Sequence, residues 1–300
     1  MSTLTADAPR SAARGAQSTE ALVTRLFTRI SEVSSIPDVA LTVVRLANDP
    51  TSETEDLLSA IRQDAALAMR IMRTVNSSYY GLPRQVADLK RAITLLGFKE
   101  IRNLVLSVYI ADLFRKTCGH GKYTRRGLWD HLVGVGTVAK LIARTCGKVP
   151  PQEAYLAGLL HDFGLILIDQ YLHRPFCRVV DALDRETPIR EVERKILGFD
   201  HTVLGEFVAA RWQLPEPLTA AIRYHHDSDR YDGPHGAVVH VVELANIFCH
   251  RKGRTPLGVR NTDLPSPRIF AGLELQEEQV ARLWEQVDET LEAADSMAIV

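Results

Sequence analysis

An apolar run in the middle of the chain contains a histidine and an aspartate side by side. Residues 156–168 are almost entirely Leu, Ile, Ala, Gly and Phe, which is typical of a buried segment, yet they include His161 and Asp162. An ionised carboxylate in such a segment costs several kcal/mol unless a partner or a metal ion compensates its charge. The chain therefore has to fold so that compensating groups surround Asp162.

Histidines elsewhere in the chain can supply that compensation, namely His131, His201 and the adjacent pair His225 and His226. Imidazole and carboxylate groups are ligands for Fe, Mn, Zn, Ni or Co, and a bridging carboxylate can hold two ions. Adjacent residues on a helix point about 100° apart. The two adjacent pairs therefore converge on metal only where a helix ends, or where two ions share one pocket.

Spacing alone leaves two interpretations open for these six residues. They form a metal centre, or the histidines are ordinary core residues. The spacings of metalloproteases and zinc fingers are absent, as is the GxSxG motif of a serine nucleophile. We assign the remaining histidines to the core or the surface: His120, His173, His235, His240 and His250.

Hydrophobic periodicity predicts an all-α fold, because helical patterns follow one another along the chain and strand patterns are scarce. We expect a disordered tail at residues 1–17 and an N-terminal helical lobe at residues 18–117. A second helical lobe, residues 118–300, would carry the adjacent pair His161 and Asp162 (the His161-Asp162 dyad) and a C-terminal helical extension. The stretch 251–267, with three prolines and two glycines, is expected to be a surface loop.

Composition limits the partners of the chain. The 300 residues carry a formal net charge of −1, which gives no electrostatic case for nucleic acid or for an anionic membrane. No apolar run reaches the roughly 18 residues of a membrane span, and no secretory signal is evident, so a cytoplasmic location is expected. The cysteines are far apart and indicate neither a thiolate zinc site nor a disulfide framework: Cys118, Cys146, Cys177 and Cys249.

A series of short segments recurs along the chain in a characteristic order: Ile36-Pro37, Asn48-Asp49-Pro50, residues 61–67, 75–81, 92–97 and 156–164, Trp212-Gln213-Leu214-Pro215, and His225-His226. Together these segments resemble the HDOD family, the HD-related output domains of bacterial signalling. The resemblance covers about residues 30–226. It implies a two-lobed, all-helical fold related to the HD-GYP cyclic di-GMP phosphodiesterases, and a regulatory module that is generally non-catalytic.

The resemblance also implies a ligand set. One metal ion would be held by Asp162, His201, His225 and His226. A second would need His131, His161, a bridging Asp162 and a further carboxylate. Asn246 stands where the hydrolases carry that carboxylate, and Leu165 stands where they carry a lysine that neutralises substrate phosphate. A site with these two replacements would stabilise the transition state of phosphodiester hydrolysis poorly.

Two functions therefore remain open. The first is an output module that binds signalling or regulatory proteins, with the metal pocket vestigial, structural or sensory. The second is a metal-dependent phosphohydrolase acting on a nucleotide or a cyclic dinucleotide second messenger. For the first, Tyr79, Tyr80 and Arg84 are the candidate interaction surface, because Tyr and Arg are enriched in interface hot spots. The alternative is that this segment caps a helix and that its tyrosines pack against the neighbouring lobe.

Overall fold

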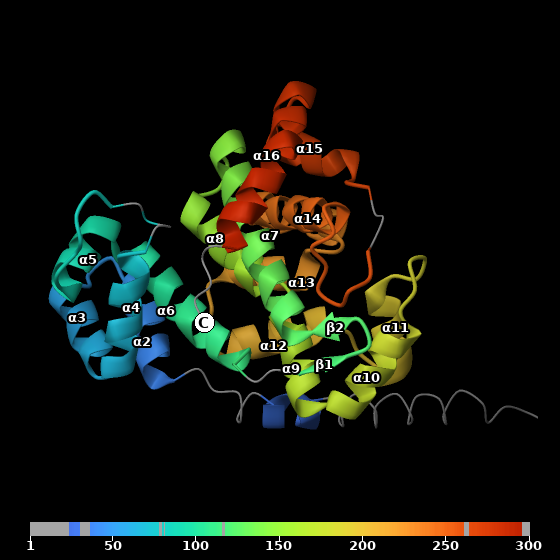
Figure 1. The fold of residues 1–300 in the computed structure, drawn as a ribbon, viewed down its shortest axis with the longest axis horizontal. Coiled ribbons are helices and arrows are strands. Elements are labelled where there is room, and N and C mark those ends of the chain that lie inside the picture. The colour runs from blue at the N-terminus through green and yellow to red at the C-terminus, as the bar shows by residue number, and fades with distance from the viewer. Residues whose placement is uncertain are drawn as a thin grey trace, which may run out of the picture.

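The computed structural model describes residues 24–30, 37–77, 80, 82–115, 118–260 and 264–295 (Figure 1). The predicted tail, residues 1–17, lies outside these residues. The described chain is helical except for one two-stranded hairpin, so the all-α prediction is confirmed. None of its helices is both long and apolar enough to cross a membrane.

Helices α2 to α5 gather on one side of the molecule, and α6 runs from them toward the later helices (Figure 1). Their bounds are α2 Asp38–Asn48, α3 Thr54–Arg62, α4 Ala65–Val75, α5 Leu89–Leu96 and α6 Phe98–Leu113. Asp64 and Asp88 begin α4 and α5 by accepting the amide hydrogens of Leu67 and Arg91 at 2.9 and 2.8 Å. Such caps stabilise a helix by about 1 kcal/mol each.

A short antiparallel hairpin, β1 Gly119–His120 with β2 Tyr123–Thr124, lies where the sequence places the boundary between two lobes. The division of the chain at this hairpin stays a prediction. After the hairpin the chain continues as α7 Arg125–Cys146, α8 Pro151–Leu160, α9 Phe163–Tyr171, α10 His173–Ala182, α11 Ile189–Leu197, α12 His201–Arg211, α13 Glu216–Tyr224, the 3₁₀ turn η1 Ser228–Arg230, α14 Gly236–Arg251, α15 Pro267–Leu273 and α16 Glu277–Asp295.

Glycines let α7 and α8 approach each other closely. A Cβ atom on Gly158 would lie 2.7 Å from the Cα of Gly136, a distance that atoms in folded proteins do not tolerate. Both helices bury nearly all their apolar side chains around this crossing. The contact fixes the relative position of the two segments that carry His131 and His161.

The stretch 251–267 is only partly the surface loop that its composition predicts. Leu257 is 2% exposed, and together with Asp162 it lines a cavity of about 170 Å³. A helix, α15, begins at Pro267. Leu257, inside the Pro- and Gly-rich stretch, is therefore buried near the dyad. The turn-forming composition of the stretch did not indicate this burial.

Candidate metal centre

Helix ends bring the predicted residues together. His161 caps the end of α8, and Asp162 lies between α8 and α9. His201 is the first residue of α12, and His225 ends α13, with His226 directly after it. His131 comes from the first turns of the long helix α7. Adjacent residues therefore converge here because the helices end, which is one of the two geometries that the sequence allows.

The two oxygens of Asp162 face different histidines. Its Oδ1 lies 3.1 Å from Nε2 of His201 and 3.1 Å from Nε2 of His225. Its Oδ2 lies 3.3 Å from Nε2 of His161 and 3.5 Å from Nε2 of His131. All of these side chains are buried, so the carboxylate sits at the centre of an enclosed cluster of imidazoles.

Each of these four histidines directs its other ring nitrogen, Nδ1, at an oxygen. The partners are the carbonyl of Arg254 for His131 at 2.9 Å, the carbonyl of Gly158 for His161 at 2.6 Å, the carboxylate of Glu193 for His201 at 2.6 Å, and the carbonyl of Ile222 for His225 at 3.0 Å. A carbonyl or carboxylate oxygen only accepts, so each Nδ1 carries the hydrogen. A neutral imidazole then has a bare lone pair on Nε2.

Bare Nε2 atoms around a carboxylate repel it and one another. Nε2 of His131 and Nε2 of His161 lie 3.3 Å apart, and both face Oδ2 of Asp162. Nε2 of His201 is buried and makes no hydrogen bond, despite its distance of 3.1 Å from the carboxylate. A metal ion between the nitrogens and the oxygens relieves this repulsion, as a proton on one of the nitrogens also does.

The separations fit metal coordination. Ligand atoms bound at 2.0–2.2 Å lie roughly 3.0 Å apart at right angles and roughly 3.4 Å apart in a tetrahedron. The nitrogen–oxygen distances of 3.1–3.5 Å fall in this range. Within the described residues, two ligand groups share Asp162: one with His131 and His161, the other with His201, His225 and His226.

The protonation state of two histidines in the second group also favours metal binding. Burial lowers the pKa of His225 to about 4. Burial, with the charge of His225, also holds the pKa of His226 well below its ordinary value. Both rings are therefore neutral near pH 7, which is the form of imidazole that binds a metal. Nε2 of His226 is buried without a hydrogen-bond partner.

His201 behaves differently because it lies between two carboxylates. Burial opposes its protonation, but the charges of Glu193 and Asp162 raise its pKa to about 10. Burial also opposes ionisation of Asp162, yet the imidazoles of His161 and His201 hold its pKa well below the usual range. Asp162 is thus an anion, and a proton on His201 competes with a metal ion for the same place.

Glycine brings the dyad and His201 together. A Cβ atom on Gly164 would lie 2.2 Å from the carbonyl oxygen of His201, so only glycine allows the start of α9 to touch the start of α12. Asp200 begins α12 by accepting the amide hydrogens of Thr202 and Val203 at 3.1 and 3.2 Å. These two local features set the direction in which the His201 ring enters the cluster.

Sequence reasoning missed three residues next to this cluster. Glu193, fully buried on α11, fixes the His201 ring through its 2.6 Å contact. Such a carboxylate behind a metal-binding histidine raises its basicity. His250, which the sequence assigns to core or surface, is buried with its ring centroid 5.3 Å from that of His131. Glu243, Asn246 and His250 follow one another on α14 at intervals of three and four residues. Such intervals place side chains on one face of a helix, and this spacing was the signal available in the sequence.

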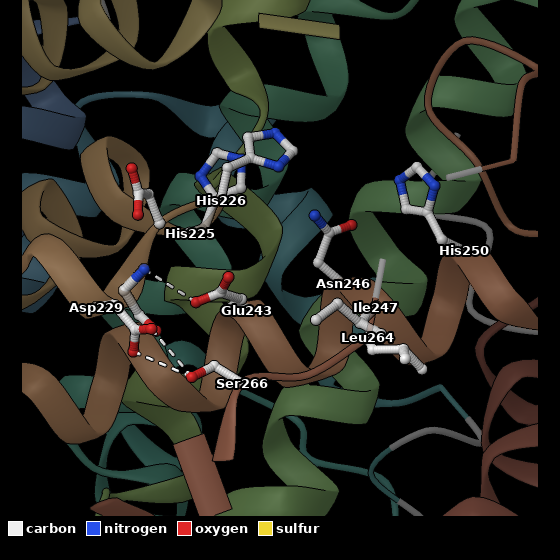
Figure 2. A pocket seen from close by; sticks show the side chains of 11 residues that line it. His225, His226, Asp229, Glu243, Asn246, Ile247, His250, Leu264 and Ser266 are labelled. Carbon is white, nitrogen blue, oxygen red and sulfur yellow. Dashed lines mark hydrogen bonds between the residues drawn. The ribbon is translucent and has the colours of Figure 1, made fainter. Parts of the chain in front are cut away.

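A cavity of about 270 Å³ opens beside the second group of ligands. Figure 2 shows Glu243, Asn246 and His250 along α14, with His225 and His226 on the segment that faces them. Among the described residues that line it, three are acidic, Asp227, Asp229 and Glu243, and none is Lys or Arg. Burial raises the pKa of Glu243 to about 7.

The two replacements noted in the sequence have different surroundings. Oδ1 of Asn246 is buried without a hydrogen-bond partner and the residue lines the cavity, so it occupies a place where a ligand would fit. The Leu165 side chain is 0% exposed and belongs to the hydrophobic core. A lysine at position 165 would therefore enter the core in this chain.

The candidate interaction surface is only partly described. Tyr79 lies outside the described residues. Tyr80 is half-buried and packs against the core, and its hydroxyl donates to Oε1 of Glu100 at 2.6 Å. Arg84 is exposed. Asn76 caps α4 and bonds the backbone of Val86 through both atoms of its amide, so packing and capping explain part of this segment.

Comparisons with known proteins agree with this fold. The family model of the HDOD domain matches residues 33–228. The chain is similar to the crystal structure of an HDOD domain protein of unknown function from Geobacter sulfurreducens, with 28% identity, a TM-score of 0.73, and coverage of 93% of this chain and 100% of that one.

Two further crystal structures share the fold. One is a candidate signal transduction protein from Marinobacter aquaeolei VT8, at 22% identity and a TM-score of 0.75, covering 94% of this chain and 64% of that one. The other is a candidate phosphohydrolase from Shewanella amazonensis SB2B, at 19% identity and a TM-score of 0.70, covering 91% of this chain and 98% of that one. The chain spans less than half the length of the curated relatives that it matches, 46% of one and 31% of the other.

Proposed function

The chain belongs to the HDOD family, and from this membership we propose that it is a signal-transduction output module that acts through protein interaction and holds metal in a degenerate HD-type pocket. The single observation that carries the metal part is the convergence of four imidazole Nε2 atoms on the buried carboxylate of Asp162. The tightest ion would be held by Asp162, His201, His225 and His226. A cytoplasmic location, where its free cysteines stay reduced, completes the proposal.

The charge of the cavity supports regulation over hydrolysis. A phosphodiester is an anion, and the cavity beside the ligands presents Asp227, Asp229 and Glu243 to it, with no basic side chain among its described lining residues. A hydrolase of this kind stabilises the transferring phosphoryl group with metal ions and cationic side chains. A metal ion bound here would still polarise an oxygen of a bound ligand, but the surroundings oppose binding of an anionic substrate.

One observation keeps hydrolysis as a second candidate. The smaller cavity, which contacts Asp162, His226 and His250, is also lined by Arg185 and Arg260, together with the acidic residues Asp184 and Glu186. These guanidinium groups could hold a phosphate next to the cluster, away from the acidic residues of the larger cavity. A phosphohydrolase acting on a nucleotide or cyclic dinucleotide would bind there.

Metal content and turnover distinguish the two functions. We expect the purified protein to hold about one transition-metal ion per chain and to hydrolyse cyclic dinucleotides and nucleotides at the background rate. The background is set by the Asp162→Asn variant, which lacks the shared ligand. Elemental analysis and a phosphodiesterase panel with added Mn²⁺ or Fe²⁺ measure both quantities. Turnover that is well above this background and disappears in the variant would establish the hydrolase instead.

We propose that the helices of the first part of the chain bind the partner. Of the large apolar side chains exposed in the described residues, Met69 on α4 and Leu95 on α5 lie there, at 64% and 53% exposure, and Leu264 lies elsewhere. Exposed Arg84 lies on the connection between α4 and α5. Exposed apolar side chains and an arginine are residue types that protein interfaces use.

Substitutions that introduce negative charge test this surface. We expect the double variant Met69→Glu/Leu95→Glu, and separately Arg84→Glu, to lose at least tenfold of the affinity for a signalling partner isolated with the wild-type protein, because a buried carboxylate is costly at an interface. Leu264→Glu is the matched control and should bind normally. Affinity is measured by titration calorimetry after circular dichroism shows native helix content. Unchanged binding in both surface variants, with loss in Asp162→Asn, would place control in the pocket instead.

A further inference from the structure

Residues 251–260, here called the covering segment, border the candidate metal centre. Leu257 of this segment is 2% exposed and lines the same cavity as Asp162. Nδ1 of His131 donates its hydrogen to the backbone carbonyl of Arg254 at 2.9 Å. The covering segment therefore lies beside the shared carboxylate and also sets the orientation of one predicted ligand ring.

Backbone geometry fixes the two ends of the covering segment. Gly253 has a φ of 84° and follows α14, and the amide of Arg254 donates to the carbonyl oxygen of Cys249 at 2.9 Å. Gly258 has a φ of 75°, and a Cβ atom there would lie 2.6 Å from the carbonyl oxygen of Lys122, in the turn between β1 and β2. Glycine at these two positions lets the chain turn sharply and pass close to the hairpin.

Two cationic side chains of the covering segment contact α16. Nζ of Lys252 lies 4.1 Å from the ring centroid of Trp284 and pairs with the carboxylate of Asp288. Arg254 pairs with the carboxylate of Asp295. The three partners stand at intervals of four and seven residues, so they lie along one side of α16. The position of α16 therefore controls where the start of the covering segment lies.

Helix α16 packs on the helix that carries His131. It contacts α7 and α14 (Figure 1), and its buried side chains include Leu283, Val287 and Leu291. A Cβ atom on Gly134 of α7 would lie 2.9 Å from Cδ2 of Leu291, so glycine makes room for this side chain. A chain of direct contacts thus joins α16, the covering segment and the ring of His131.

We infer that α16 holds the covering segment against the metal centre, and that release of α16 opens the centre to exchange of metal and ligands. The inference rests on the metal centre proposed above and concerns its regulation. The residues involved, 251–260 and 277–295, follow the part of the chain that the HDOD family model matches. Because coupling between two sites is reciprocal, occupation of the centre is expected to strengthen the docking of α16.

The competing interpretation is that α16 only completes the hydrophobic core. Its ion pairs with the covering segment would then have no effect on access to the centre. The partners on α16, Asp288 and Asp295, are exposed at 63% and 50% of their side-chain surface. Ion pairs of this kind contribute little to the stability of a whole fold. Substitutions at these two positions therefore change the contact with the covering segment while the protein stays folded.

Charge reversal at these positions tests the inference on the full-length, metal-loaded protein. Asp288→Lys/Asp295→Lys places like charges beside Lys252 and Arg254 and leaves the buried face of α16 unchanged. We expect a chelator to remove metal from this variant about tenfold faster than from the wild type, because the covering segment opens more often. Circular dichroism first confirms native helix content, and Asp288→Asn/Asp295→Asn should give a smaller effect in the same direction.

Two further variants exclude a general effect of charge. Glu285→Lys/Glu289→Lys makes the same charge change at exposed positions of the same helix, so it is the matched control and should release metal at the wild-type rate. Adding Lys252→Glu/Arg254→Glu to the first variant restores opposite charges across the contact. We expect this combination to return the release rate to within about twofold of the wild type.

A second measurement needs no metal. In the metal-free protein, hydrogen–deuterium exchange of residues 251–260 should be about tenfold faster in Asp288→Lys/Asp295→Lys than in the wild type. If no form of the protein binds metal, the proposed centre fails, and this exchange alone decides the inference. Exchange equal to that of the wild type, or a rate of metal release that charge reversal leaves unchanged, would overturn it.

Discussion

Replacing Asp162 with Asn is expected to remove the bound metal and to lower the unfolding temperature of the metal-loaded protein by about 5 °C. Asn keeps the shape of the side chain but loses the charge that two groups of histidines share. A ligand present at a hundredfold excess over its dissociation constant stabilises the folded state by about 2.7 kcal/mol. For a chain of this size each kcal/mol corresponds to roughly 2 °C. Elemental analysis and thermal unfolding, with and without a chelator, measure the two effects.

The response to the chelator separates a metal centre from a buried ion pair. If metal compensates Asp162, the chelator lowers the unfolding temperature of the wild type and leaves that of Asp162→Asn unchanged. If a proton on His201 compensates it instead, the chelator has no effect on either protein. Asp200→Asn is the control, because it weakens a buried carboxylate that pairs with Arg194 while Asn still caps α12. This control should keep its metal.

Sequence alone predicts the centre of the site because its residues conflict with their surroundings. Asp162 lies in an apolar run, and helix ends let adjacent ligand pairs converge; α8 ends at Leu160 and α13 at Tyr224. Capping residues such as Asp88 and Asp200 likewise mark helix starts by their residue type and position alone. These features are local, so a few residues of sequence carry them.

Residues that act across the fold escape such reasoning. Glu193 has ordinary helical neighbours, and only the packing of α11 against the start of α12 places it behind His201. His250 reaches His131 because α14 crosses α7, a contact between segments far apart in the sequence. Tertiary packing decides both positions, and no local pattern encodes it.

Replacing Asn246 with Asp is expected to raise the metal content from about one to about two ions per chain. The buried Oδ1 of Asn246 has no hydrogen-bond partner, so the substitution breaks no contact at that atom and adds the negative charge that a second dication needs. His131 and His161 direct Nε2 at Oδ2 of Asp162, and the family resemblance places the second ion between these residues and position 246. With two ions in place, we expect hydrolysis of a simple activated phosphodiester to rise at least tenfold above the wild-type rate.

The lysine of the hydrolases should not be restored together with this aspartate. Leu165 is fully buried in the core, and a lysine there would leave an unpaired charge among apolar side chains. Leu165→Lys is therefore expected to lower stability by several kcal/mol without adding activity, and Asn246→Ala is the matched control for position 246. Asn246→Asp/Asp162→Asn should lose both the extra metal and the gained turnover. A metal content that stays at one ion in Asn246→Asp would mean that position 246 does not face the second ion, and that its difference from the hydrolases does not explain the weak chemistry of this pocket.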